Sequence, residues 1–254
     1  MSLKKMINTY NETSLHKTLK NIYALENDGS TEQKFASYIC DIITNKGDVI
    51  EIQTSNISAL TQKAEFILKN DKKLTIIHPI IQKKLITTYS EDGTLLLKRK
   101  SPKESTIYSM LRGLTGIYKL LTHKNFILEV LFIDLEEIRV KTKEKIQSKN
   151  KSRHHLKDYL IQDKKLISIN SKLRFRTKED YKKLLVLEEY DDFTVPKVKK
   201  AIFQKFTSQK MTKANAQSAA KNAGLLVWIL EKMGIIRQKG FQGRSRLYSL
   251  EEKN

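Results

Sequence analysis

Two short apolar segments of this chain are each interrupted by one carboxylate, and this pattern constrains the fold more than any other feature of the sequence. Residues 38–43 and 49–54 lie on either side of the turn-forming residues 44–47, so they predict two strands joined by a hairpin. Asp41 lies in the first segment and Glu51 in the second. An ionised carboxylate inside an apolar strand is costly unless it is paired or bound to a metal ion. The hairpin therefore predicts a site where the two acids meet.

The segments around this hairpin alternate between helical and extended patterns. Apolar residues recur at helical spacing in residues 15–25, 57–68 and 107–121. Apolar runs predict strands over residues 74–77, 84–89, 94–98 and 126–133, and His78-Pro79 is expected to end the first of these strands. Helices and strands that alternate along a chain indicate an α/β fold, here a mixed sheet flanked by helices.

The two acids have the chemistry of a metal site. Because side chains alternate along a strand, Glu51 and Gln53 share one face of the second segment, and a short hairpin would bring Asp41 alongside Glu51. Carboxylates without a histidine or cysteine partner suit a hard cation such as Mg²⁺ or Mn²⁺, and such an ion can activate a water for attack on a phosphodiester. The alternative is structural: Asp41 would bond to the backbone or to Lys34, and Glu51 and Gln53 would line a solvated face.

This arrangement resembles the PD-(D/E)XK nuclease superfamily, in which an Asp on one strand is followed on the next strand by Glu or Asp, any residue, and Lys. The residues Asp41 and Glu51-Ile52-Gln53, with the predicted order helix, hairpin, helix, strand, carry the resemblance. It implies a restriction-endonuclease-like fold in which Asp41, Glu51 and the Ile52 carbonyl hold Mg²⁺ or Mn²⁺. It also implies a carboxylate from the first helix, for which Glu12 is the first candidate and Glu32 the second.

One position departs from the superfamily pattern, because Gln53 occupies the place of the lysine. A glutamine can orient a water but cannot supply positive charge to a developing anion. As in some relatives of that superfamily, Lys63 on the following helix is the residue that would reach into the site instead. The resemblance therefore implies a catalytic set of Asp41, Glu51, Gln53, Glu12 and Lys63.

The excess of basic residues indicates a polyanionic partner. The 254 residues include 48 Lys and Arg against 28 Asp and Glu, a net charge of +20. Residues 139–183 alone contain 16 basic and 5 acidic residues, a net charge of +11. Within this segment, we expect residues 139–157 to form an exposed basic arm or loop. Double-stranded DNA is the partner that this charge favours, and a merely solubilising surface is the alternative.

Membrane and secretory segments are not expected. The longest apolar run, residues 224–230, is far shorter than the roughly 20 residues that a membrane-spanning helix needs. Residues 1–7 are basic, but the apolar stretch that a signal peptide requires does not follow them. The one cysteine, Cys40, excludes a disulfide framework, so the sequence predicts a cytoplasmic protein without a membrane partner.

The C-terminal segment has the order of a winged helix. Helical patterns over residues 181–187, 195–206 and 213–233 precede a predicted hairpin with the basic, glycine-containing tip 239–243. The last of these patterns is either one long helix or one broken near Gly224. We therefore expect two domains, a nuclease-like one over residues 1–175 and a winged-helix domain over residues 176–254. A winged helix that serves protein contacts instead is the alternative.

The residues expected to contact DNA fall into three groups. Cations and small polar side chains at the start of the last helix can lie in a major groove, and cations on the hairpin or in the loop near residue 100 can contact phosphates. These residues are Lys213, Asn215, Gln217, Ser218 and Lys221 on the helix, Arg237, Lys239, Arg244 and Arg246 on the hairpin, and Arg99, Lys100 and Lys103 in the loop.

Together these features predict a Mg²⁺-dependent DNA endonuclease that a winged helix docks on duplex DNA, with a role in restriction, defence or repair. The alternative is a non-catalytic DNA-binding protein or regulator on a degenerate nuclease-like core, which Gln53 keeps open. RNA processing is a third hypothesis with less support, since the sequence has no aromatic strand typical of RNA-binding modules. Double-strand cleavage by one such site would imply a homodimer.

Overall fold

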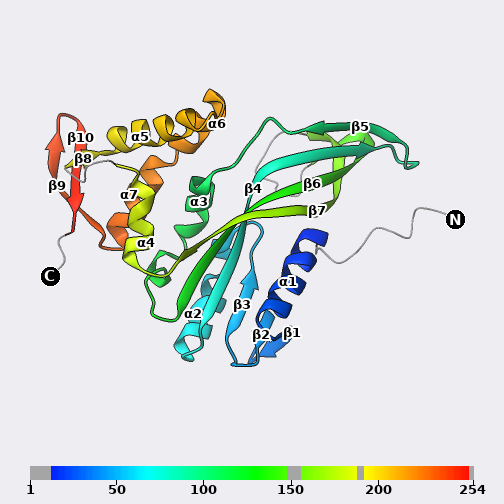
Figure 1. Cartoon of the computed structure of the whole chain (residues 1–254), viewed down its shortest axis with the longest axis horizontal. Coiled ribbons are helices and arrows are strands. Elements are labelled where there is room, and N and C mark those ends of the chain that lie inside the picture. Colours follow the sequence, from blue (N-terminus) through cyan, green and yellow to red (C-terminus); the bar gives the residue numbers. More distant parts are fainter. Residues whose placement is uncertain (1–12, 148–155, 188–191, 252–254) are drawn as a thin grey trace.

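The structure is a computed structural model that describes residues 13–147, 156–187 and 192–251. The part up to residue 175 is a seven-stranded mixed sheet with helices on both faces (Figure 1). Its helices are α1 (Ser14–Glu26), α2 (Thr61–Lys69) and the short α3 (Leu111–Leu114). Its strands are β1 (Gly29–Phe35), β2 (Tyr38–Thr44), β3 (Val49–Ile52), β4 (Leu74–Tyr89), β5 (Leu95–Lys100), β6 (Phe126–Gln147) and β7 (Leu156–Phe175). This architecture confirms the mixed α/β class that the sequence predicts.

The sheet has the order β1-β2-β3-β4-β6-β7, and β5 pairs with the outer part of β4. Strands β3, β4 and β6 run parallel, and the other neighbouring pairs are antiparallel. The predicted hairpin is present, because β2 and β3 pair through Ile42 with Ile50 and through Ile43 with Val49. The two strands that carry the acids are therefore neighbours in the sheet.

Two hydrophobic layers hold helices on opposite faces of the sheet. Leu19 of α1 belongs to one layer together with Ile77 of β4, and Ile67 of α2 belongs to the other layer together with Ile76. Successive side chains of a strand point to opposite faces, so Ile76 and Ile77 divide the core between the two helices. The helices predicted over residues 15–25 and 57–68 are confirmed, with residues 57–60 as a 3₁₀ turn. Side chains from α1 and α2 consequently approach the same strands from opposite sides.

Strand β4 is much longer than predicted, because it continues through His78-Pro79 as a single strand of 16 residues. The prediction that these residues end the strand is wrong. The Gln53 amide donates to the Ile77 carbonyl at 2.8 Å, so Ile77 directs its backbone groups toward β3. Pro79, two residues further on, directs its nitrogen to the same side, but β3 has already ended at Ile52, opposite Ile77. The N–H that proline lacks is therefore not needed at this position.

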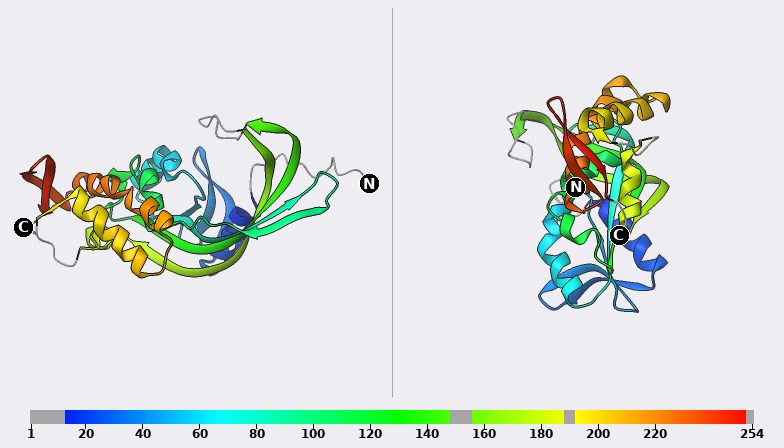
Figure 2. Two further views of the ribbon diagram at one scale, coloured as in Figure 1. Left: turned by 90° about the horizontal axis from the view of Figure 1, so that it is seen from above. Right: turned by 90° about the vertical axis from the view of Figure 1, so that its left-hand side faces the viewer.

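The predicted basic arm is a pair of strands and not a loop. Strand β6 extends to Gln147 and β7 begins at Leu156, and the two form an antiparallel ladder, while residues 148–155 of the arm lie outside the described residues. This stretch contains few apolar residues, so the periodicity of the sequence does not predict its strands. The backbone ladder stabilises the two strands, as do contacts such as that of the Arg139 guanidinium with the Tyr159 ring, 3.9 Å from the ring centroid. Figure 2 shows the outer ends of β6–β7 and β4–β5 projecting beyond the helices as two hairpin arms.

The helix predicted over residues 107–121 is interrupted. It consists of 3₁₀ turns at Ile107–Met110 and Tyr118–Leu120 on either side of α3. The carbonyls of Gly113 and Gly116 accept hydrogen bonds from the hydroxyls of Ser58 (2.7 Å) and Thr61 (3.2 Å). A tertiary contact with the start of α2 therefore shapes this segment, and sequence periodicity does not report such a contact.

The C-terminal part contains helices and a small three-stranded sheet. The helices are α4 (Lys178–Lys182), α5 (Val195–Ser208), α6 (Lys213–Ala220) and α7 (Ala223–Lys232). The sheet has the order β8-β10-β9, built from β8 (Phe193–Thr194), β9 (Ile236–Gln242) and β10 (Ser245–Leu250). The helical segment predicted over residues 213–233 is two helices, since α6 ends at Ala220 and α7 begins at Ala223, close to the break considered at Gly224. The Asn222 side chain between them donates to the Ser218 carbonyl at 3.2 Å. In the part of the chain that the structure describes, no helix is long and apolar enough to cross a bilayer.

This C-terminal part packs on the segment of residues 107–121 that lies against the sheet. The Tyr108 hydroxyl donates to the Leu184 carbonyl at 2.8 Å, and the rings of Tyr118 and Trp228 meet edge to face with centroids 5.3 Å apart. One cluster of buried residues continues from β4 and β6 into α5 and α7. The division into two domains near residue 175 stays a prediction, although the chain passes from β7 to α4 there.

Glu129 of β6 is a buried carboxylate that contacts Arg174 of β7 and Tyr23 of α1. Glu129 is 3% exposed, and Arg174 donates to its Oε2 atom at 2.9 and 2.6 Å, while the Tyr23 hydroxyl donates to Oε1. We expect Arg174→Ala to lower the free energy of unfolding by about 2 kcal/mol, because it leaves a buried charge without its cation although Arg174 itself is largely exposed. Urea unfolding measures this change. Arg176→Ala, at an exposed position two residues further on, is the control, and an equal loss there would contradict the assignment.

Candidate functional site

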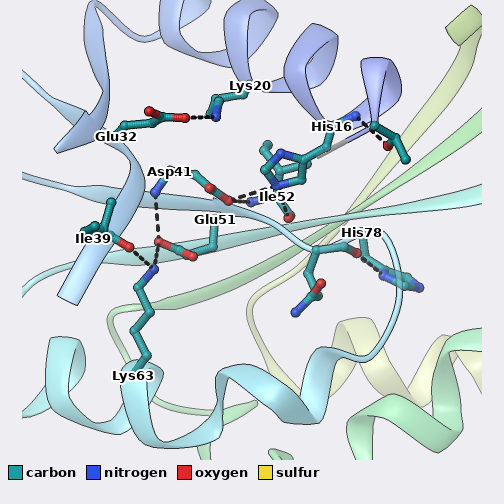
Figure 3. A network of polar contacts seen from close by, with 11 residues as sticks. His16, Lys20, Glu32, Ile39, Asp41, Glu51, Ile52, Lys63 and His78 are labelled. Atoms are coloured by element: carbon teal, nitrogen blue, oxygen red, sulfur yellow. Dashed lines mark hydrogen bonds and ion pairs between the residues drawn. The ribbon is translucent and has the colours of Figure 1, made fainter. Parts of the chain in front are cut away.

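The candidate site lies in a gap between β2 and β3. The ladder between these strands consists of two residue pairs, and beyond Ile42 and Ile50 the strands separate. Side chains replace the missing backbone bonds: the Ile52 amide donates to Asp41 Oδ2 at 2.8 Å, and the Asp41 amide donates to Glu51 Oε1 at 3.2 Å. Figure 3 shows the two carboxylates side by side in this gap. The structure thus brings together the two acids that the sequence singles out.

Lys63 of α2 reaches the gap from one face of the sheet. Its Nζ atom lies 2.6 Å from Glu51 Oε1 and donates to the Ile39 carbonyl at 2.6 Å. Both side chains are largely enclosed, with 14% of the Lys63 side chain and 5% of the Glu51 side chain exposed. A positive charge therefore lies beside Glu51 even though β3 carries no lysine.

His16 of α1 reaches the gap from the opposite face. Its Nε2 atom lies 2.9 Å from the Ile52 carbonyl oxygen and 3.3 Å from Asp41 Oδ2. Since a carbonyl can only accept, Nε2 carries the hydrogen in this contact. Sequence patterns alone favour a structural role for His16. Helical periodicity could have identified His16 as facing the sheet, because it shares a helix face with the buried Leu19 and Tyr23.

The surroundings give the two carboxylates different acidities. Burial raises the pKa of Asp41, but hydrogen bonds from His16 and from the Ile52 amide outweigh it and hold that pKa below its ordinary value. Burial and the nearby Asp41 charge hold the pKa of Glu51 above its ordinary value, against the effect of Lys63. Asp41 is therefore the more readily ionised member of the pair.

Gln53 follows the last residue of β3 at the rim of the gap. Its carbonyl accepts a hydrogen bond from Nδ1 of the buried His78 at 2.6 Å. Burial lowers the pKa of His78, which favours the neutral imidazole, and Nδ1 is the nitrogen that carries the hydrogen. His78 therefore anchors the backbone next to Glu51 and Ile52, and Gln53 itself remains partly exposed.

The donor atoms at the gap fit a magnesium or manganese ion. Asp41 and Glu51 offer carboxylate oxygens, and the Ile52 carbonyl has a second lone pair besides the one that faces His16. Mg²⁺ commonly keeps several waters and needs only one or two carboxylates from a protein. Among the described residues no three His, Cys, Asp or Glu side chains form a metal-binding group. The fit therefore depends on the two carboxylates and the carbonyl.

Of the two candidates for a further carboxylate, the structure describes only Glu32, which does not extend this set. Glu12 lies outside the described residues. Glu32 of β1 forms an ion pair with Lys20 of α1 at 2.7 Å, and 64% of the Glu32 side chain is exposed. Figure 3 shows this pair on the α1 side of Asp41.

The residues expected to contact DNA are mostly at the surface. Exposed are Arg99, Lys100, Lys103, Lys213, Gln217, Ser218, Lys221, Arg237, Lys239, Arg244 and Arg246, of which Arg99 and Lys100 belong to β5 rather than to a loop. Lys239 forms an ion pair with Asp192 at 3.1 Å, and Arg237 lies 3.9 Å from Glu251. Asn215 is the exception, because it is 7% exposed and its Nδ2 atom donates to the Pro102 carbonyl at 3.0 Å. The expected contact of Asn215 with a base edge does not agree with this buried position.

Two comparisons with known proteins found similarity to this chain. No solved structure matches the chain. An uncharacterized protein of Treponema pallidum (strain Nichols) is 30% identical over 172 residues, which cover 68% of this chain but only 65% of the length of that relative. A family described as a domain of unknown function (DUF8091) matches residues 13–176, a stretch that includes α1 to β7 and the whole gap between β2 and β3. The chain therefore belongs to this family.

Proposed function

We propose that the protein is a metal-dependent DNA endonuclease that hydrolyses phosphodiester bonds and is similar to the PD-(D/E)XK nucleases. The observation that carries this proposal is the gap between β2 and β3, where Asp41, Glu51 and Lys63 meet. Enclosing two carboxylates and an ammonium group at one point costs free energy of desolvation, which a purely structural contact does not require. A site that binds a cation and a phosphodiester accounts for all three charges.

Each residue has its own task in this proposal. Asp41 and Glu51 would hold Mg²⁺ or Mn²⁺ together with the Ile52 carbonyl, and the bound ion would lower the pKa of a water and neutralise phosphate charge. Lys63 supplies, from α2, the positive charge that Gln53 lacks. Gln53 orients the attacking water through its side-chain amide. His16 positions Asp41 and the Ile52 carbonyl.

We further propose that the C-terminal part is a winged helix that docks the enzyme on duplex DNA. The order α4, β8, α5, α6 and α7, β9, β10 supports this assignment, as does the position of β10 between β8 and β9. Exposed cations on α6 and on the β9–β10 hairpin would contact phosphates. A cytoplasmic role in restriction, defence or repair, and a homodimer for double-strand cleavage, belong to the same proposal.

Supercoiled plasmid incubated with the purified protein and Mg²⁺ or Mn²⁺ tests the proposed activity. We expect nicked or linear plasmid from the unaltered protein, and none from a variant that carries both Asp41→Ala and Glu51→Ala. Cleavage that persists in a contaminant-free double variant would refute the site. An intact plasmid that still shifts on a gel would favour a binding-only protein.

A non-catalytic DNA-binding protein is the second candidate, and Gln53 is the observation that favours it. In a degenerate site the gap between β2 and β3 would keep its polar contacts but would no longer bind a cation. Lys63 would then serve only as the partner of Glu51 and of the Ile39 carbonyl. The two candidates therefore differ in whether the folded protein binds a divalent ion.

Thermal unfolding in the presence of Mn²⁺ separates the two candidates. A ligand that binds only the folded state raises Tm saturably, so we expect such a rise in the unaltered protein and none in Glu51→Ala. Because the pKa of Glu51 is raised, the effect of Mn²⁺ should disappear as the pH falls through that pKa, since the protonated acid no longer binds the ion. Glu65→Ala, which removes an exposed acid of α2, is the control and should keep the rise. The absence of any saturable rise at neutral pH would support the binding-only candidate.

A further inference from the structure

The loop of residues 101–106, which follows β5 in the chain, contacts helix α6. At its start the Ser101 amide donates to the Lys84 carbonyl at 2.7 Å, which ties the loop to β4. The next carbonyl, that of Pro102, accepts a hydrogen bond from Nδ2 of Asn215 at 3.0 Å. Figure 1 shows α6 beside the connection that leaves β5 toward α3. The start of α6 is thereby fixed next to the end of β5.

Helix α6 has an inward side and an outward side. Its buried residues are Asn215, Ala216, Ala219 and Ala220, and small alanines allow the helix to lie close to the body of the protein. The exposed residues Lys213, Gln217, Ser218 and Lys221 recur at the spacing of one helical face. Asn215 therefore orients the helix from its inward side, and the outward side is available to a partner.

The exposed charges on both sides of this contact are nearly all positive. Residues 98–106 and 212–221 contain one acid, Glu104, and six cations, and all seven side chains are exposed: Lys98, Arg99, Lys100, Lys103, Lys213, Lys221 and Glu104. Like charges held near one another are unfavourable unless an anionic partner neutralises them. Duplex DNA, with one negative charge per about 1.7 Å of its axis, matches such a row of cations.

The β5 part of this row lies on the same side of β4 as β3, which carries part of the candidate site. Strand β3 ends opposite Ile77, and β4 continues beyond that point to Leu85, which pairs with Lys100 of β5. At about 3.3 Å per residue, Lys100 lies about 25 Å along the strand from the end of β3. One turn of B-DNA measures about 34 Å, so a single duplex can contact the row and the gap within one turn.

We propose that the six cations named above and the outward side of α6 bind one DNA duplex as a single continuous surface, the β5–α6 track, with Asn215 as its positioning residue. The inference rests on the proposed DNA-directed function and specifies which surface holds the duplex. Asn215 does not contact DNA; it aligns α6 with Lys103 through the Pro102 carbonyl. The duplex then runs from β5 past α6, toward the end of β3 at which the gap opens.

Charge reversal tests whether the track binds DNA. Lys103→Glu and Lys213→Glu should each weaken binding of a fluorescent duplex of about 30 base pairs by about tenfold at about 0.1 M salt, with EDTA present. Each should also reduce the slope of log K against log salt by about 0.9 or more. Lys46→Glu is the matched control, because it makes the same change at an exposed turn at the opposite end of β3, and it should alter affinity by less than about twofold.

Cleavage reagents at single cysteines test whether the track is continuous. Cys40 is the one cysteine of the chain, and it is buried with its pKa raised to about 11 by burial, so it should resist labelling. Iron–EDTA attached at Lys103→Cys or at Ser218→Cys should cut the same duplex of about 12 base pairs, which is little more than one turn long. The same reagent at Lys46→Cys should not cut it. Cutting from one of the two track positions without the other would overturn the continuous track.

Asn215→Ala tests the positioning role. We expect Asn215→Ala to weaken duplex binding about fivefold, because α6 and Lys103 are no longer held in position to contact the same duplex. The slope of log K against log salt should also fall by about 0.9, which corresponds to one phosphate contact. Asn222→Ala is the matched control, since the Asn222 side chain donates only within its own segment in the contacts described, to the Ser218 and Ala219 carbonyls. A loss of Tm with an unchanged slope in Asn215→Ala would show a merely structural role and would overturn the assignment.

The outcomes also separate the track from the proposed function. If Lys103→Glu and Lys213→Glu behave like Lys46→Glu while Arg244→Glu loses binding, DNA is held by the β9–β10 hairpin and the track is wrong, but the DNA-directed function stands. If the unaltered protein does not bind duplex DNA, the proposed function and the track fail together.

Discussion

Asp41→Ala is expected to reduce Mg²⁺-dependent plasmid cleavage by about 10³-fold and to leave the affinity for duplex DNA unchanged. The pKa of Asp41 is held below its ordinary value, so this carboxylate is ionised at neutral pH and lies beside Glu51 in the gap. Its removal takes away one of the two carboxylates that would hold the metal ion. The rate of nicking measures the first effect, and fluorescence anisotropy of a labelled duplex measures the second.

A second variant separates lost chemistry from a distorted strand. Alanine at position 41 also removes the acceptor of the Ile52 amide, which lies 2.8 Å from Asp41 Oδ2. Asp41→Asn keeps an oxygen acceptor but has no charge, so it should fold normally and still be as inactive as Asp41→Ala. Asp48→Ala is the matched control from the other end of the hairpin, where Asp48 pairs with Lys73 at 3.7 Å, and it should cleave at the normal rate. Normal cleavage by Asp41→Asn would exclude a metal-binding role.

Lys63→Met is expected to lower the cleavage rate by about 10²-fold while the Mn²⁺-dependent rise in Tm is retained. Methionine preserves the apolar stem of the side chain, which is largely enclosed, and removes the ammonium group that lies 2.6 Å from Glu51. Because Lys63 competes with a divalent ion for Glu51, its loss should not weaken binding of the ion. Asp41 and Lys63 therefore differ in a measurable way: one variant loses the ion, and the other keeps it without cleaving.

A lysine returned to β3 provides a direct check on this role. Gln53→Lys in the Lys63→Met background places a lysine where the PD-(D/E)XK pattern has it, and it should restore part of the lost rate. Lys69→Met, at an exposed position at the end of α2, should behave like the unaltered protein. An unchanged rate in Lys63→Met would mean that Lys63 only bonds to Glu51 and to the Ile39 carbonyl.

The core of the site could be predicted because its signals are local. Asp41 and Glu51 stand in neighbouring segments of one hairpin, so apolar context and a short turn are enough to place them together. Lys63 is predicted by the resemblance alone, and it reaches the site because α2, which follows β3 after a 3₁₀ turn, packs against the sheet. The alternation of helical and extended patterns likewise determines the mixed α/β class.

Other features depend on contacts that no local pattern reports. His16 enters the gap because α1 packs against strands that follow it in the chain, and Pro79 is tolerated because β3 has ended beside it. The outer parts of β6 and β7 are strands although they have few apolar residues, because each satisfies the backbone of the other.

The sequence by itself therefore determined the fold class, the pair of acids and the positive charge, which are properties of composition and short-range periodicity. Only the tertiary structure decided which side chains surround that pair and which surfaces are continuous. Asn215 illustrates the difference, since it has the sequence features of a base-reading residue but bonds to Pro102, 113 residues away in the chain. Packing between such distant segments depends on three-dimensional proximity, which local sequence patterns do not encode.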